Sequence, residues 1–423
     1  MARAARSYNV NPATVPAVAD DATPGRWRML ALLGLAELLG MSLWFAGSAM
    51  APQLQARFQL SGTAVAALTT AVQIGFVFGT AGSALLNLAD VIPARRFFAG
   101  AALLGAVANL PLAFSSTLPV IFISRFVTGA ALAGVYPPAM KMAATWFRAR
   151  RGLAVGAVVG ALTIGKAGPY LAHAVPGATV EAITLLASAS ALGAALLVFT
   201  MYHDGPFAFP SRPFSWALVG DVFRTRRWRL ATGGYLGHMA ELYSYWTWIP
   251  AFIAASVVGD AHALTAPSSP AIAALSFGVI AVGGAGCIWG GLLSDRIGRG
   301  PLVIRAMAIS GACCALVGLA FGRPLWILAP IALVWGFFII ADSAQFSVLV
   351  TESVPPHAVG TALTLQTSLG FLLTTVTIQV VPPLVRYAGW PWAFVLLAIG
   401  PFLGIQSIRR IDRPGRMKHS SLD

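Results

Sequence analysis

The sequence has few charged residues. Of its 423 residues only 10% are Asp, Glu, Lys or Arg, whereas 57% are hydrophobic. Because a soluble domain carries roughly 25% charged residues, this composition excludes a soluble globular protein and predicts a polytopic membrane protein. The net charge is +14, but the bases cluster in short loops and tails and do not indicate a nucleic-acid-binding surface.

Cysteines are scarce and the signatures of enzymes are missing. Cys287, Cys313 and Cys314 lie in apolar stretches without the spacing of metal ligands or of a disulfide framework, and we interpret them as small core residues. The sequence contains no GxSxG or HExxH motif and no complete Walker motif, GxxxxGK followed by Ser or Thr. We therefore expect neither an enzyme nor a metal site, and we interpret His238 as a partner of Glu241 on one helix face.

Long apolar stretches make up most of the chain. A helix needs about 20 apolar residues to cross a hydrocarbon core of about 30 Å. The first stretch is too long to be the apolar region of a signal peptide. Twelve stretches qualify as membrane-spanning helices: 27–50, 63–86, 97–115, 119–142, 153–174, 180–202, 230–256, 270–293, 302–321, 325–348, 359–383 and 388–407.

A polar linker, broken by three prolines, divides these helices into two sets of six. Most Lys and Arg residues fall in segments on one side of the predicted topology, and only Arg57, Arg323 and Arg386 fall in loops on the other. The positive-inside rule therefore places both termini in the cytoplasm. The predicted organisation is a cytoplasmic tail at 1–26, a six-helix half at 27–202, a cytoplasmic linker at 203–229, a second six-helix half at 230–407 and a basic cytoplasmic tail at 408–423.

A glutamate recurs in the middle of two apolar stretches. Glu37 and Glu241 lie about half the chain apart, each stands between an alanine and a leucine, and Trp44 and Trp248 each follow their glutamate by seven residues. A carboxylate inside a membrane helix is costly enough to indicate a functional site. Its repetition at this spacing indicates a duplicated helix bundle with the site between the halves.

Charged side chains inside the predicted helices are the first candidates for that site. They are Glu37, Arg125, Lys166, Glu241 and Asp342. Each costs about 2.5–3.5 kcal/mol near the centre of a membrane helix, so they should face one another or water. We expect the two glutamates, and next Asp342, to carry a coupling proton, with the two bases neutralising them or holding an anionic substrate group. The alternative is that each acid is permanently paired and only specifies helix docking.

Helical spacing identifies the residues that share a face with these charges. The predicted substrate and coupling site comprises Glu37, Trp44, Arg125, Lys166, His238, Glu241, Tyr245, Trp248, Asp342 and Gln345. Further residues on the same helix faces are Met41, Ser48, Tyr136, Tyr170, His173 and Trp335. Glycines at every fourth position form three further stripes, which we predict to be the surfaces on which the halves slide. These stripes are Gly75 and Gly79; Gly152, Gly156 and Gly160; and Gly286 and Gly290.

A loop signature follows the eighth predicted helix. Gly291-Leu292-Leu293-Ser294-Asp295-Arg296-Ile297-Gly298-Arg299 resembles the signature of the major facilitator superfamily. A degraded copy in the first half, Leu88-Ala89-Asp90 followed by Arg95-Arg96, lacks the glycines of that signature. In the family this loop forms an ion-pair latch that holds the inward side shut. The resemblance therefore implies a cytoplasmic gate formed by Asp90, Arg95, Asp295, Arg296 and Arg299.

Other segments resemble motifs of the same family. Arg125-Phe126-Val127-Thr128-Gly129 resembles its fourth-helix motif with a buried arginine, and Gly168-Pro169 resembles only the core of its antiporter motif. The segment 146–152 resembles the loop between helices 4 and 5 of several bacterial branches, nitrate and nitrite porters among them. Those porters use an arginine in each of helices 2 and 8, which this chain does not show, so we discount nitrate.

The resemblance implies an all-α membrane protein with twelve transmembrane helices in two pseudo-symmetric six-helix halves, around a cavity lined by helices 1, 4, 7 and 10. It implies a secondary active transporter that moves a small-molecule substrate by alternating access. From the carboxylates inside the helices we expect H⁺ as the coupling ion, and we expect no other cofactor. We expect a functional monomer in the lipid bilayer of a bacterial inner membrane, without a nucleic-acid partner. The alternatives are an efflux antiporter for drugs or metabolites and a transport-inactive receptor on the same fold.

Overall fold

The computed structural model describes residues 23–86, 88–147, 150–207, 215–264, 269–355 and 358–411, without the side chains of Ala89, Asp90 and Arg151. Most of the predicted N-terminal tail, the middle of the linker and most of the C-terminal tail therefore lie outside the described residues. The side chain of Asp90, a predicted gate residue, lies outside them as well. The described chain is helical and contains no strand.

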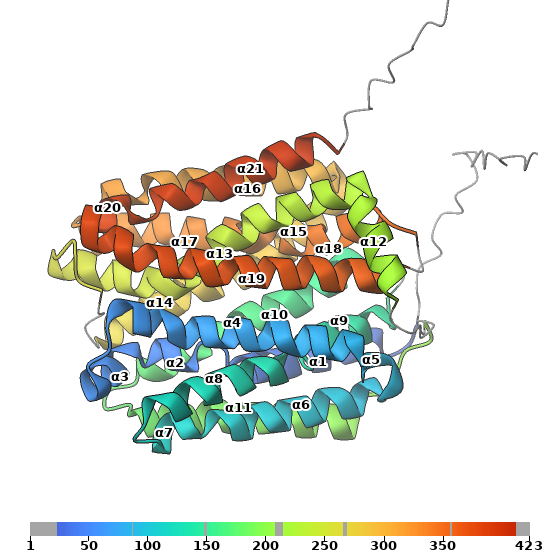
Figure 1. Ribbon diagram of the computed structural model, residues 1–423, viewed down its shortest axis with the longest axis horizontal. Coiled ribbons are helices and arrows are strands. Elements are labelled where there is room, and N and C mark those ends of the chain that lie inside the picture. Colours follow the sequence, from blue (N-terminus) through green and yellow to red (C-terminus); the bar gives the residue numbers. More distant parts are fainter. Residues whose placement is uncertain are drawn as a thin grey trace, which may run out of the picture.

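The helices of the first half of the chain form one layer, at the bottom of Figure 1. They are α1 (Arg26–Met41), α2 (Ala46–Ala49), α3 (Ala51–Phe58), α4 (Gly62–Leu85), α5 (Leu88–Val91), α6 (Ala94–Asn109), α7 (Pro111–Phe114), α8 (Leu118–Leu132), α9 (Tyr136–Ala144), α10 (Arg151–His173) and α11 (Val180–Met201).

The helices of the second half form the upper layer, so the two halves are folded separately and packed against each other (Figure 1). They are α12 (Trp216–Arg224), α13 (Arg226–Val258), α14 (Pro270–Ala281), α15 (Gly283–Ile297), α16 (Arg299–Leu316), η2 (Val317–Ala320), α17 (Leu325–Ala341), α18 (Ser343–Thr351), α19 (Val359–Ala388), α20 (Trp390–Ala393), η4 (Val395–Ala398) and α21 (Ile399–Arg409).

Ten stretches of the described residues are long and apolar enough to cross a membrane. They match all the predicted spans except 27–50 and 230–256, which correspond to α1–α2 and to α13. These two segments carry the buried glutamates, and α13 is buried along almost its whole length from Ala231 to Ser256. Because protein rather than lipid surrounds such a helix, it can hold polar residues that lower its hydropathy.

Several predicted spans are broken in the middle. The first span is interrupted at residues 42–45, between α1 and α2, and the tenth at Asp342, between α17 and α18. The fourth is interrupted before α9, which begins Tyr136-Pro137-Pro138. Proline has no N–H to donate and its ring clashes with the carbonyl four residues earlier, so the helix restarts there instead of continuing. The seventh span, in contrast, stays one helix of 33 residues.

Two seams join the halves: α4 packs against α19, and α10 packs against α14 and α15. At the second seam Gly156 and Gly160 face the backbone carbonyls of Cys287 and Gly284, and a Cβ atom added at either glycine would come within 2.9 Å of them. This stripe therefore joins the halves as predicted. The prediction is wrong for the other two stripes, because Gly75 and Gly79 pack on α8, and Gly286 and Gly290 pack on α17, each within one half.

Candidate functional site

The five charges predicted inside the helices are all buried, with at most 1% of each side chain exposed. Glu37 and Lys166 lie together in the first half. The neighbouring residues Leu38 and Gly165 bring the backbones of α1 and α10 into direct contact, so close that no side chain would fit at Gly165. Glu37 and Lys166 interact electrostatically across this contact. Neither carboxylate oxygen of Glu37 has a hydrogen-bond partner within the described chain.

Lys166 extends from the first half into a group of aromatic side chains that we call the lysine cage: Trp44, Tyr243 and Trp246. Its Nζ atom lies 3.9 Å from the centre of the Trp44 ring, 4.7 Å from that of Tyr243 and 5.0 Å from that of Trp246. Nζ also donates a hydrogen bond of 2.5 Å to the Tyr243 hydroxyl. Because Tyr243 and Trp246 belong to α13, the cage joins the two halves of the molecule.

Aromatic side chains surround the cage. The Trp44 ring lies 5.2 Å from Phe76 of α4 and 5.5 Å from Phe371 of α19, and these two phenylalanines are 4.4 Å apart. The indole N–H groups of Trp44 and Trp246 are buried and have no hydrogen-bond partner among the described residues. An indole N–H is a donor only, and buried donors in proteins are nearly always paired. The centre of the molecule therefore holds unused donors beside an ammonium group.

Arg125 has a different environment. Its Nη1 donates to Asn109 Oδ1 at 3.0 Å, and its Nη2 donates to the carbonyl oxygens of Leu43 at 3.0 Å and Trp44 at 2.5 Å. These two carbonyls belong to the break between α1 and α2, where the helical hydrogen bonds are interrupted. Arg125 thus donates to the backbone of the segment that carries Trp44, and within the described chain none of its hydrogen bonds goes to an acid.

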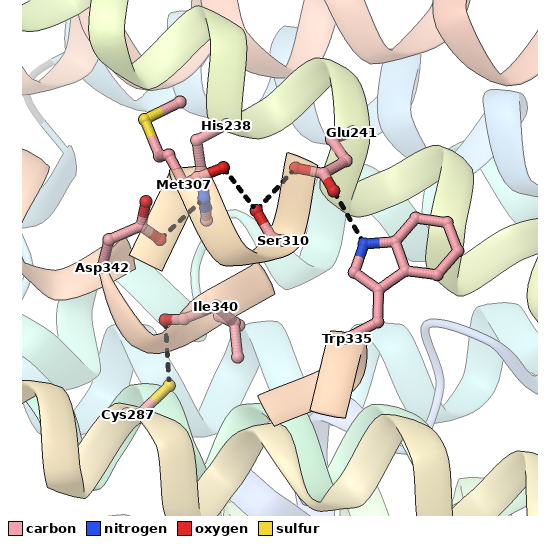
Figure 2. Close-up of polar contacts among 8 residues, drawn as sticks. All are labelled: His238, Glu241, Cys287, Met307, Ser310, Trp335, Ile340 and Asp342. Carbon is pink, nitrogen blue, oxygen red and sulfur yellow. Dashed lines mark hydrogen bonds and ion pairs between the residues drawn. The ribbon is translucent and has the colours of Figure 1, made fainter. Parts of the chain in front are cut away.

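Glu241 is hydrogen-bonded inside the second half (Figure 2). Its Oε1 accepts from Trp335 Nε1 of α17 at 2.7 Å, and its Oε2 accepts from Ser310 Oγ of α16 at 3.0 Å. Trp335 is predicted to share a helix face with Asp342, whereas Ser310 is not predicted, because no charged or aromatic residue lies within one helical turn of it in α16. Both oxygens of Glu241 therefore have a fixed donor, unlike those of Glu37.

His238 pairs with Asp342, not with Glu241. Its Nδ1 lies 3.0 Å from Asp342 Oδ1, and both side chains are buried (Figure 2). The predicted partnership of His238 and Glu241 is wrong, although residues three apart on a helix are neighbours on its surface. The His238 side chain contacts Asp342, which follows α17, whereas Glu241 accepts hydrogen bonds from Trp335 of α17 and Ser310 of α16. No group of metal-binding side chains occurs in the described part of the chain.

The other predicted site residues in α13 and α18 lie in the same half. The Tyr245 hydroxyl is within hydrogen-bond distance of the carbonyls of Val279 and Ala332, and Trp248 Nε1 donates to Ile378 O at 2.9 Å. Gln345 is buried, and its side-chain amide has no partner within the residues described. Tyr245 and Trp248 therefore have backbone partners, whereas Gln345 has unused donors and an acceptor.

A small pocket of about 50 Å³ lies between the halves, and Ser269, Ile272 and Ala273 at the start of α14 contribute to its wall. The predicted residues Ser48, Tyr170, His173 and Trp248 contribute to its wall. Ser48 Oγ lies 2.6 Å from the Thr69 hydroxyl and His173 Nδ1 lies 3.2 Å from the Gln53 amide, so both are engaged on the first-half side. At the other end of the bundle, the α10–α15 seam holds the halves together.

Sequence reasoning missed Tyr243, Trp246, Phe76 and Phe371. The stripe through Glu241 selects one face of α13, but the structure buries this helix on all sides, so residues off the stripe also face the centre. The dense aromatic run from Tyr243 to Trp248 was the available signal. The phenylalanines of α4 and α19 carry no signal of their own.

The comparisons with known proteins place this arrangement in a family. The family model of the Major Facilitator Superfamily matches residues 32–378, most of the chain. The chain belongs to the major facilitator superfamily. No curated protein matches it in sequence. A crystal structure of a variant of the nucleoside transporter NupG superposes with a TM-score of 0.66, covering 91% of this chain and all of that one, at 16% identity.

These findings confirm the predicted all-α fold with two six-helix halves. They show that this major facilitator protein is a multi-pass membrane protein that transports a small solute. At 16% identity the likeness to NupG shows the fold alone.

The predicted gate residues of this facilitator belong to α5, the start of α6, the end of α15 and the start of α16. Asp295 is exposed, and its Oδ1 would lie 3.6 Å from a Cβ atom at Gly152, so its carboxylate approaches the start of α10 in the other half. Arg299 forms an ion pair with Glu352. Arg95 is exposed over the ring of Phe199, and Arg296 is exposed. The latch role of these residues stays a prediction, with Asp295 the member that reaches across the halves.

Proposed function

We propose that this chain is a proton-coupled secondary transporter that works by alternating access, with Glu37 as the acid that binds and releases the coupling proton. The observation that carries the proposal is the environment of Glu37. Its side chain is 0% exposed and has no hydrogen-bond partner among the described residues, and Lys166 is the charge that acts on it. A charged carboxylate is costly in such surroundings, so its protonation should respond when water or a counter-charge reaches it.

The contacts between the halves support alternating access. The α10–α15 seam closes one end of the bundle, whereas the pocket beside Thr247 and Ser276 lies between the halves at the other end. The centre between these ends is filled by the lysine cage, to which both halves contribute. A rocking motion that opens one end and closes the other would separate Lys166 from Tyr243 and expose Glu37 alternately to the two sides.

Glu241 is the second candidate for the coupling acid. Its two hydrogen bonds come from Trp335 and Ser310, which belong to the same half and would move together with it. An acid whose donors move with it keeps its environment when the halves rock, whereas Glu37 lies next to a base that contacts the opposite half. This difference favours Glu37 as the coupling acid and a positioning role for Glu241 in packing α13, α16 and α17.

We also propose that the end of the bundle with Arg226, Arg227 and Arg229 faces the cytoplasm of a bacterial cell. These side chains are exposed at the start of α13. The preceding helix, α12, lies at the same end of the bundle as α5, which belongs to the predicted gate (Figure 1). Basic residues flanking membrane helices are retained on the cytoplasmic side. We therefore expect the predicted gate on the cytoplasmic side as well.

The test uses the full chain in proteoliposomes that enclose a pH-sensitive dye. Small anions, cations and neutral solutes are added one at a time, and the sign of the lumenal pH change distinguishes symport from antiport. We expect Glu37→Gln to abolish solute-driven proton movement and uphill accumulation, but to retain exchange of labelled for unlabelled solute, which needs no net proton release. Uphill accumulation at the wild-type level in Glu37→Gln would refute the assignment.

A matched control is Glu181→Gln, the same change at an exposed glutamate of α11, which should leave coupling unchanged. Glu241→Gln separates the two candidate acids. If this variant loses uphill accumulation while Glu37→Gln keeps it, the coupling proton is bound in the second half and our choice between the acids is wrong.

A further inference from the structure

The groups beside Lys166 are mostly hydrogen-bond donors. Nζ has three N–H bonds, and among the described residues one hydrogen bond from it is seen, to the Tyr243 hydroxyl. Trp44 and Trp246, whose ring centres lie 3.9 and 5.0 Å from that ammonium, are 0% and 1% exposed, and their N–H groups have no partner in the described residues. Among the described residues, both halves of the chain thus supply side chains with unused donors to the surroundings of Lys166.

We propose that the lysine cage is the binding site for the carboxylate of an organic anion with an apolar or aromatic body. A carboxylate accepts several hydrogen bonds and carries the charge that complements Lys166. The rest of such a molecule would lie against Phe76 and Phe371, which contact the Trp44 ring and have no polar atoms. A cationic solute fits less well, because it brings a second positive charge and no acceptor for the indole donors.

Charge balance links this site to Glu37. At present the cage holds one base, Lys166, and one neighbouring acid, Glu37, and a buried net charge is costly. When a carboxylate binds to Lys166, the site keeps the same balance only if Glu37 takes up a proton. Two titratable groups interact with Glu37, namely Lys166 on α10 and the Tyr136 hydroxyl on α9. Helix α11 also packs on α1, through small residues such as Ala194. The anion and one proton therefore bind together, a step that rests on the proposed function.

Binding by the purified full-length chain tests the substrate class without requiring transport. The probes are matched triplets of one shape: benzoate, benzamide and benzylamine, and the corresponding phenylacetate, phenylacetamide and phenethylamine. Tryptophan fluorescence and thermal unfolding in detergent report binding. We expect at least one carboxylate to bind at least about 10-fold more tightly than its amide and its amine, since it alone forms a charge-assisted contact with Lys166.

Side-chain variants locate the site. Lys166→Gln should weaken carboxylate binding by about 10- to 100-fold, and Lys166→Arg, which keeps the charge, should retain more of it. Trp44→Phe and Trp246→Phe keep a ring but lose the N–H, and each should weaken binding by about 5- to 10-fold. The matched control is Trp228→Phe on α13, because Trp228 Nε1 already donates to Ala362 O at 3.1 Å and lies away from the cage.

Some outcomes would overturn the assignment. They are tighter binding of the amines, equal binding of carboxylates and amides, no carboxylate binding in either triplet, or unchanged carboxylate binding in Lys166→Gln. Proton uptake on binding, measured with a dilute pH indicator, separates this inference from the proposed function. Carboxylate selectivity without proton uptake would support the binding site and refute coupling through Glu37, whereas uptake of about one proton that is lost in Glu37→Gln supports both.

Discussion

Arg125→Met is the variant that best separates a structural from a substrate-binding arginine. In the structure the guanidinium donates three hydrogen bonds, to Asn109 and to the carbonyls of Leu43 and Trp44, in a site that is 1% exposed. Methionine fills a similar space but leaves these three acceptors without their donor. A buried acceptor that loses its partner costs about 1–3 kcal/mol, and the losses are not fully additive.

We therefore expect Arg125→Met to lower the free energy of unfolding by about 3–5 kcal/mol. Arg125→Lys keeps the charge but offers a single nitrogen in place of the planar fork, so it should fall between Met and the wild type. Thermal or SDS-induced unfolding in detergent measures the effect. The control is Arg323→Met, the same change at an exposed arginine, which should have little effect.

One result would refute a structural role for Arg125. If Arg125→Met unfolds like the wild type but no longer binds or transports solute, the guanidinium does not stabilise the break between α1 and α2. Arg125 would then have the role predicted from its position in the sequence, as a base that neutralises an acid or holds an anionic substrate group.

Two further predictions concern the seam between the halves and the second half. In Gly156→Leu the new side chain meets the carbonyl of Cys287, which a Cβ atom would approach to 2.9 Å. It should therefore force α10 away from α15, raise the labelling rate of cysteines introduced along this seam and abolish transport. Gly278→Leu, where no atom lies within 4 Å of the new Cβ, should do neither. For His238 and Asp342, a double-mutant cycle with His238→Gln and Asp342→Asn should give a coupling free energy of about 1 kcal/mol or more in unfolding experiments, because the pair is buried with 3.0 Å between its atoms. Additive effects would show that the contact contributes nothing, and the same cycle with His238 and Glu241 should be closer to additive.

Local patterns account for what could be predicted. The spans follow from runs of apolar residues, and the gate signature is contiguous, so neither depends on distant parts of the chain. The burial of Glu37, Arg125, Lys166, Glu241 and Asp342 also follows, because a charge at the centre of an apolar helix has to be turned away from lipid. Helical spacing failed at α13, where it selected His238 as the partner of Glu241.

The partners of the charges depend on which helices become neighbours. Arg125 reaches the backbone of residues 43 and 44 only because the chain breaks after α1, and no motif in that segment indicates the break. Trp335 and Ser310 meet at Glu241 from two helices that are separate in sequence. The three glycine stripes look alike in sequence, yet only the one in α10 lies between the halves.

The sequence by itself determined the membrane-spanning architecture, the two-fold repeat and the residues that must be buried, because hydropathy and charge act on each helix separately. Only the tertiary structure decided that Glu37 stands without hydrogen-bond partners in the described chain while Glu241 is hydrogen-bonded, and that Lys166 enters a cage built by both halves. These differences arise from side-chain packing between helices, because a shift of one helix by one residue relative to its neighbour changes which side chains are paired.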